Sequence, residues 1–111
     1  MSKPLIYLAS PYTDPDHTVM EDRFHKVCEK AGELMRQGHM IFSPIAHTHP
    51  IAVRCELPRP FEFWEDYDRI ILARCNALWI YQLPGWAQSK GVAREVVLAM
   101  EYNLSIEYIP S

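Results

Sequence analysis

Short apolar runs alternate with amphipathic helical patterns along this chain of 111 residues. Residues 5–9 form an unbroken apolar run, which is typical of a strand that is buried on both faces. Apolar residues then recur at helical spacing from Met20 to Met35, and Gly38 follows where a helix would end. Strands that alternate with helices favour a parallel sheet covered on both faces. We therefore predict a three-layer α/β fold, Rossmann-like or flavodoxin-like, with four to five parallel strands flanked by helices, as one domain over residues 1–111.

Residues 44–61 lack both of these patterns. They hold prolines and histidines without helical or alternating spacing, so the sequence predicts a long irregular connection there. Open parallel sheets bind ligands beyond the carboxyl ends of their strands. The loops at 10–16, 44–57 and 83–89 are therefore expected to surround a site. The remaining predicted elements are strands at 40–43, 77–81 and 106–109 and helices at 64–75 and 92–100.

Composition restricts the partners and the compartment of the protein. The formal net charge of -3 lacks the basic excess that binding to a nucleic-acid polymer requires. The three cysteines form no C-x-x-C pair, which is typical of reduced thiols. Neither a leader peptide nor a membrane span is visible in the sequence. These features predict a cytoplasmic protein without membrane or nucleic-acid partners.

The segment SKGVARE at 89–95 is the sharpest local pattern of the chain. Ser89 is placed to cap the predicted helix, and Gly91 would let a ligand approach the first turn. Glu95 follows about one turn later and should lean back toward that end of the helix. The helix dipole would keep its carboxylate ionised, which suits a nucleophile. The alternative is that Ser89 merely caps the helix and that Glu95 is a solvated surface acid.

Asp66 and Asp68, on the predicted helix at 64–75, are candidates for a second carboxyl group. A carboxyl group with a raised pKa can protonate a leaving base or hold its nitrogen by a hydrogen bond. Cleavage of a glycosidic bond with retention of configuration at the anomeric carbon needs two groups: an ionised carboxylate as the nucleophile and a second group as the acid. The alternative is that both aspartates are ordinary exposed acids near the start of a helix.

His47 and His49 are expected to face a substrate from the loop that follows the second strand. The same pair could bind zinc if His39, Cys55 or Glu56 supplied a third ligand. No H-x-x-x-H or C-x-x-C spacing supports that alternative, so no metal and no other cofactor is expected. Among the aromatic residues, Tyr7, Tyr12, Trp64 and Trp86 could stack on a base, although Tyr7 and Trp64 could equally belong to the core.

Three segments together resemble the nucleoside 2-deoxyribosyltransferase superfamily, and within it a small uncharacterised DUF1937-like branch. The opening IYLASPY at 6–12 is similar to the first strand and loop of the superfamily. Asp68, which precedes Asn76 by eight residues, is similar to its helix-borne active-site aspartate. The spacing of Ser89, Gly91 and Glu95 resembles its Ser-x-Gly-x-x-x-Glu signature. The segment SPIAHTHP at 43–50 is typical of the branch, and the likeness covers the chain as a single domain of this kind, 1–111.

The resemblance implies a nucleoside or nucleotide N-glycosidase or a 2-deoxyribosyltransferase. Glu95 would attack the anomeric carbon, Asp68 would assist the leaving base, and Tyr7 would orient Glu95 or the sugar. It also implies a homodimer or a higher homo-oligomer. The residues expected to contact a small-molecule nucleoside or nucleotide are Ser10, Tyr12, His47, His49, Trp64, Ser89 and Gly91.

Two departures from the superfamily pattern leave another function open. Ser10 and Pro11 stand where related enzymes have a glycine-containing loop or a phosphate-binding serine, and Asn76 stands where an aspartate is usual. A non-catalytic nucleotide-binding module is therefore the alternative to an enzyme.

Overall fold

The computed structural model describes residues 3–57 and 61–111 and contains one parallel sheet of four strands. The strands are β1 (Leu5–Ala9), β2 (Met40–Phe42), β3 (Ala77–Gln82) and β4 (Ser105–Pro110), in the spatial order β2-β1-β3-β4. All three strand pairs are parallel, as predicted. The chain leaves β1 toward β2 on one side and later returns to β3 on the other. The strand order therefore reverses between β1 and β3.

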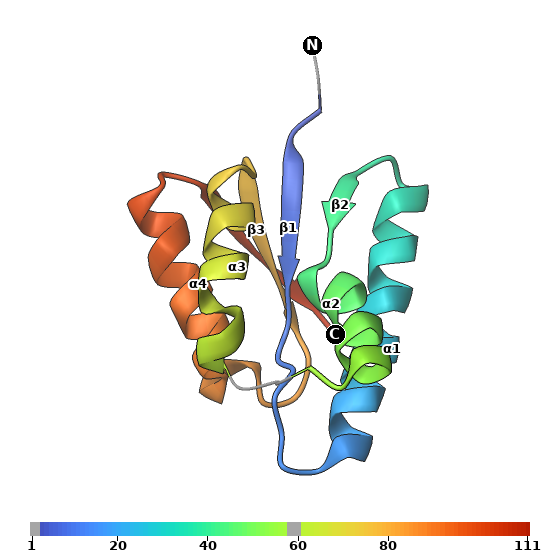
Figure 1. Cartoon of the computed structure of the whole chain (residues 1–111). Coiled ribbons are helices and arrows are strands. Elements are labelled where there is room, and N and C mark those ends of the chain that lie inside the picture. The colour runs from blue at the N-terminus through green and yellow to red at the C-terminus, as the bar shows by residue number, and fades with distance from the viewer. Residues whose placement is uncertain (1–2, 58–60) are drawn as a thin grey trace.

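Helices cover both faces of this sheet, as Figure 1 shows. On one face α1 (His17–Arg36) packs against Leu8 through Val27 and Leu34. On the other face α3 (Phe61–Ala73) and α4 (Lys90–Glu101) pack around Tyr7. Successive residues of β1 thus enter two different cores, which explains why its sequence is apolar without alternation. The predicted three-layer α/β architecture of Rossmann-like or flavodoxin-like type is confirmed.

The long first helix begins and ends where the sequence indicates. The side chain of Asp16 accepts a hydrogen bond from the backbone N–H of Thr18 and so caps the start of α1. Arg36 is the last helical residue, and Gly38 follows with a φ of 97°, a conformation that favours glycine. The chain then turns directly into β2.

The prediction of an irregular connection at 44–61 is wrong, because residues Pro44–Cys55 form the helix α2. Ser43 caps this helix, and its Oγ accepts a hydrogen bond from the N–H of Ala46 at 3.2 Å. Pro44 occupies the first turn of this helix. Backbone N–H groups there have no partner within the helix, so the N–H that proline lacks costs no hydrogen bond. Pro50 lies inside the helix, and it is the residue that hides the helical pattern in the sequence. Residues 58–60 lie outside the described part of the chain.

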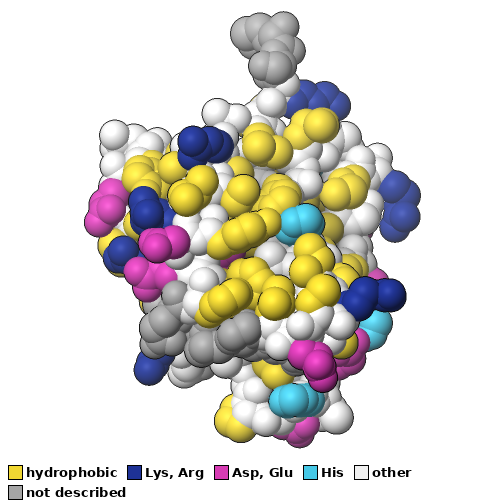
Figure 2. Space-filling view, in the orientation of Figure 1, with side chains coloured by type: hydrophobic (Ala, Val, Ile, Leu, Met, Phe, Trp, Pro, Cys, Tyr) yellow, Lys and Arg dark blue, Asp and Glu magenta, His cyan; other side chains and the backbone are white. Residues whose placement is uncertain are grey.

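The helices α2 and α3 carry apolar side chains on the molecular surface. α3 exposes Phe63, Tyr67 and Ile70, and α2 exposes Ile51. Figure 2 shows apolar side chains gathered where α2 and α3 face the viewer. Among the described residues, no helix combines the length and the apolar character needed to span a membrane.

Candidate active site

A cavity of about 370 Å³ lies at the carboxyl edge of the sheet. Its walls come from the loop after β1, from α2 and α3, and from the start of α4. This is the edge at which the strand order reverses, where open parallel sheets characteristically bind ligands. The residues that sequence analysis predicted and that line this cavity are Ser10, Tyr12, His49, Trp64, Asp68, Ser89, Gly91 and Glu95.

Glu95 is buried in this wall, with 9% of its surface exposed. The Tyr7 hydroxyl donates a hydrogen bond to Glu95 Oε2. Burial raises the pKa of Glu95 to about 8, the charge of Asp68 adds to this effect, and the hydrogen bond from Tyr7 opposes it. The expectation that the helix dipole keeps Glu95 ionised is therefore wrong, because desolvation outweighs it. The alternative of a solvated surface acid is wrong as well.

The two aspartates of α3 have different surroundings. Asp66 is exposed and pairs with Arg69, with 3.2 Å between Oδ1 and Nη2. Asp68 faces the cavity, and burial raises its pKa to about 7. Asp68 and Glu95 thus lie on neighbouring helices in one cavity, and each binds a proton more tightly than an exposed carboxyl group would. Between the two values the pair holds one proton and one negative charge.

Tyr7 lies beneath the cavity rather than in its lining. Its ring is fully buried in the core between β1 and the helices α3 and α4, and burial raises its pKa well above the ordinary value. The phenol therefore remains a proton donor at all pH values at which the protein would work. It fixes Glu95 Oε2 and leaves the other carboxylate oxygen without this bond.

Replacing Tyr7 with Phe is expected to raise the pKa of Glu95 further. The substitution removes the hydrogen bond that favours the ionised carboxylate, while the buried ring keeps its place in the core. The pKa can be followed by NMR titration of ¹³C-labelled glutamate side chains, with Tyr108→Phe on the exposed strand β4 as the matched control. An unchanged titration of Glu95 in the Tyr7 variant would contradict this assignment.

His47 does not line the cavity, which corrects the prediction that it faces a substrate. It is exposed on α2, and its ring stacks on that of Tyr67 at 6.4 Å between ring centres. Residues two apart on a helix point about 200° apart, so His47 and His49 face different surroundings. The same geometry removes the zinc hypothesis for this pair. Across 3–57 and 61–111, no three His, Cys, Asp or Glu side chains gather as a metal site would need.

The start of α4 opens directly on the cavity. Ser89 caps the helix, and its Oγ accepts a hydrogen bond from the N–H of Val92 at 3.2 Å. Gly91 has no packing neighbour that would exclude a Cβ, since the nearest atom is Ser89 Oγ at 3.8 Å. Its small size instead leaves the first helical turn accessible from the cavity. Ser10 lies at the end of β1 with 6% exposure, and its Oγ has no hydrogen-bond partner among the described residues.

Two residues of α1 that were not predicted from the sequence organise the rim of the cavity. Arg23 donates hydrogen bonds to the carbonyl oxygens of Tyr12 and Thr13 at 3.3 and 3.2 Å, and to that of Pro84 at 3.3 Å. It thereby joins the loops that follow β1 and β3. Glu21 accepts a hydrogen bond from His49 at 2.9 Å. Pro84 lies 61 positions from Arg23 and His49 lies 28 positions from Glu21, so no local pattern could have indicated these two contacts.

Asn76, which stands where the superfamily pattern has an aspartate, lies at the end of the strands that is remote from the cavity. Its Oδ1 accepts a hydrogen bond from the N–H of Leu5 at 2.8 Å, at the amino ends of β1 and β3. It therefore ties two strands together at a place that does not belong to the lining of the cavity.

The fold and the cavity together define an α/β protein in which a cavity with two carboxyl groups, buried Glu95 and half-buried Asp68, lies at the reversal of the strand order. A model of the domain of unknown function DUF1937 matches residues 4–108, and the chain belongs to this family. No curated protein matches the sequence significantly.

Proposed function

We propose that this protein cleaves the N-glycosidic bond of a nucleoside or nucleotide, as a glycosidase or a 2-deoxyribosyltransferase. The observation that carries the proposal is the pairing of Glu95 with Asp68 in one cavity, where both carboxyl groups have a raised pKa. Retaining glycosidases divide their chemistry between an ionised carboxylate and a proton-bearing acid. The resemblance of the segment 89–95 to the deoxyribosyltransferase signature supports the same assignment.

In the first step, the ionised carboxylate of Glu95 attacks the anomeric carbon. The bond from that carbon to the base nitrogen breaks, and its electron pair leaves with the base. Asp68 in its protonated form assists the departing base, by a hydrogen bond or by its proton. Water or a second base then attacks the glycosyl ester and releases Glu95. Tyr7 orients the nucleophile throughout, because its hydroxyl holds one of the two carboxylate oxygens.

The size and lining of the cavity suit such a substrate. A volume of about 370 Å³ is within the range of small-molecule sites. Trp64 and Ile45 supply apolar surface for a base, while Ser89 and the first turn of α4 offer donors to the sugar or its 5′ substituent.

The proposal is tested by incubating the protein with a panel of purine and pyrimidine nucleosides and their 5′-monophosphates. Wild type is expected to release free base from at least one member, and Glu95→Ala is expected to release none. Glu101→Ala, on the exposed end of the same helix, is the matched control. If wild type releases base no faster than Glu95→Ala across the panel, the catalytic proposal fails. Calorimetry that then shows nucleotide binding would favour the non-catalytic module.

We also propose a cytoplasmic homodimer or higher homo-oligomer. The exposed apolar side chains of α2 and α3 support association, because a second copy would remove them from water. All three cysteines are unpaired, which agrees with a reducing compartment. Light scattering that gives the mass of one chain of 13.0 kDa would disprove the assembly, and cell fractionation tests the compartment.

A further inference from the structure

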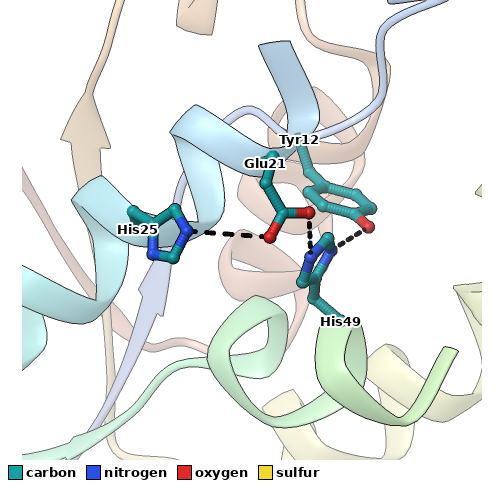
Figure 3. Close-up of polar contacts among 4 residues, drawn as sticks. All are labelled: Tyr12, Glu21, His25 and His49. Atoms are coloured by element: carbon teal, nitrogen blue, oxygen red, sulfur yellow. Dashed lines mark hydrogen bonds and ion pairs between the residues drawn. The ribbon is translucent and has the colours of Figure 1, made fainter. Parts of the chain in front are cut away.

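Figure 3 shows a chain of polar contacts that joins Tyr12, His49, Glu21 and His25. The Tyr12 hydroxyl lies 2.5 Å from His49 Nδ1, and His49 Nε2 lies 2.9 Å from Glu21 Oε2. The other oxygen of Glu21 lies 3.6 Å from His25 Nε2 on the next turn of α1. Tyr12 and His49 line the cavity, whereas about half of the Glu21 side chain is exposed. The chain therefore connects the ligand space with solvent.

His49 is the buried link of this chain. It has 3% exposure and separates the cavity from a shallower surface hollow that Glu21 and Arg54 border. The ring of Phe24 stacks on the imidazole, with 4.3 Å between ring centres and an interplanar angle of 26°. These contacts hold the imidazole so that one nitrogen faces Tyr12 and the other faces Glu21.

The chemistry of the three groups fixes which way protons can move. An ionised carboxylate is only an acceptor, so the hydrogen between His49 and Glu21 belongs to His49 Nε2. When His49 is neutral, Nδ1 accepts the proton of the Tyr12 hydroxyl. When His49 is protonated, Nδ1–H donates to Tyr12 Oη, and the Tyr12 proton becomes available to the cavity. The Glu21 carboxylate balances the charge that His49 then carries.

Resting on the function proposed above, we propose that Tyr12 is the general acid that protonates the departing base, with His49 and Glu21 as the residues that position and supply its proton. A nucleophile and its leaving group lie on opposite sides of the carbon under attack. Glu95 reaches the cavity from α4, while Tyr12 and His49 reach it from the loop after β1 and from α2. Figure 1 shows α4 and α2 on opposite sides of β1. The relay therefore lies across the cavity from the nucleophile, on the side where the base departs.

The proton balance closes over the two steps. As the bond to the base breaks, the Tyr12 proton moves to the base, and the proton on His49 Nδ1 moves to Tyr12 Oη. His49 becomes neutral and Glu95 becomes a glycosyl ester. In the second step water attacks the ester and gives its proton to Tyr12, whose own proton returns to His49. Asp68, which shares a wall with Glu95, contributes a hydrogen bond to the substrate rather than the transferred proton.

The test compares two leaving groups on the same sugar. Each nucleoside that wild type cleaves is paired with the 4-nitrophenyl glycoside of its sugar, because 4-nitrophenol leaves without being protonated. Tyr12→Phe is expected to lower kcat/KM for the nucleoside about 10²–10³-fold. The loss for the nitrophenyl glycoside is expected to stay below about 5-fold, because that reaction needs no general acid. Glu21→Gln, at an exposed position, should give a smaller loss with the same selectivity.

The controls separate this proposal from the proposed function. Glu33→Gln lies on the same helix with nearly the same exposure as Glu21 and should leave both reactions unchanged. Glu95→Gln should abolish both reactions, because both need the nucleophile. Equal losses on the two substrates for Tyr12→Phe, or none on either, would overturn the relay while the enzyme assignment stands. A wild type that releases base from no nucleoside would overturn both.

Discussion

Replacing Glu95 with Gln is expected to lower base release by at least about 10³-fold while making the protein more stable above neutral pH. The amide keeps the shape of the side chain and can still accept the hydrogen bond from Tyr7, but it cannot attack a carbon. A residue that serves folding would show the opposite effect on stability when it is replaced. Loss of activity together with a gain in stability is therefore a signature of a functional carboxylate.

The sign of the stability effect follows from the raised pKa. Glu95 has an ordinary pKa of 4.5 and a folded-state pKa of about 8, so between these values the folded protein holds a proton that the unfolded chain releases. The stability of wild type therefore falls as pH rises through this window, by up to about 1.4 kcal/mol per pH unit from this group. Glu95→Gln cannot ionise and escapes this loss. Its advantage in Tm should be small at pH 5 and largest at pH 9.

Thermal unfolding of wild type and Glu95→Gln at pH 5 and pH 9 measures this effect directly. We expect the variant to melt at least about 5 °C above wild type at pH 9. Glu101→Gln, at an exposed position of α4, controls for charge removal from the same helix. If Glu95→Gln melts below wild type at both pH values, the raised pKa of Glu95 is refuted.

The second large effect concerns the pH dependence of base release. The productive state needs Glu95 ionised and Asp68 protonated. Because Asp68 has the lower pKa, this state is the minor form of the singly protonated pair, and its share is greatest between pH 7 and 8, where activity should peak. Below this range both carboxyl groups are protonated and the nucleophile is absent. Above it both are ionised and Asp68 no longer donates a hydrogen bond.

Asp68→Asn should change both sides of this profile. The amide keeps an N–H donor at every pH, so the alkaline fall attributed to Asp68 should disappear. The acid limb should then follow the ionisation of Glu95 alone, whose pKa burial still raises but the charge of Asp68 no longer does. Initial rates from pH 5 to 10 would show both changes, with Asp66→Asn on the exposed side of α3 as the control. A variant profile that coincides with that of wild type would exclude Asp68 from the titrating pair.

Sequence patterns predicted the strands and their parallel direction, because each strand of this sheet has its own local signal. Residues 5–9 are apolar throughout since they serve two cores, and capping residues indicate the helices on either side. The helix α2 was not predicted, because Pro50 inside it is a residue that usually breaks a helix. Ser43 and Pro44 are typical of a helix start and point the other way. The local sequence alone therefore does not decide between a helix and a loop at these residues.

Most residues of the candidate site were predicted from the sequence, but the raised pKa of Glu95 was not. The spacing of Ser89 and Glu95 places a carboxylate one turn into a helix, and that position is confirmed. The burial of Glu95 depends on Tyr7 and on the packing of α3 against α4, which are contacts between remote segments. The pairing of His49 with Glu21 is likewise a contact across 28 positions of the chain. Such contacts decide pKa values and leave no trace in local spacing.

The bridging by Arg23 has a consequence for anyone who wishes to reshape the mouth of the cavity. Gly85 lies beside the guanidinium with a φ of 93°, and a Cβ placed there would come within 2.7 Å of Arg23 Nη2. A side chain at position 85 would therefore strain its own backbone and push the guanidinium away from the Pro84 carbonyl. Positions 23 and 85 are thus coupled, and libraries that diversify the loop after β3 should vary them jointly or leave both untouched.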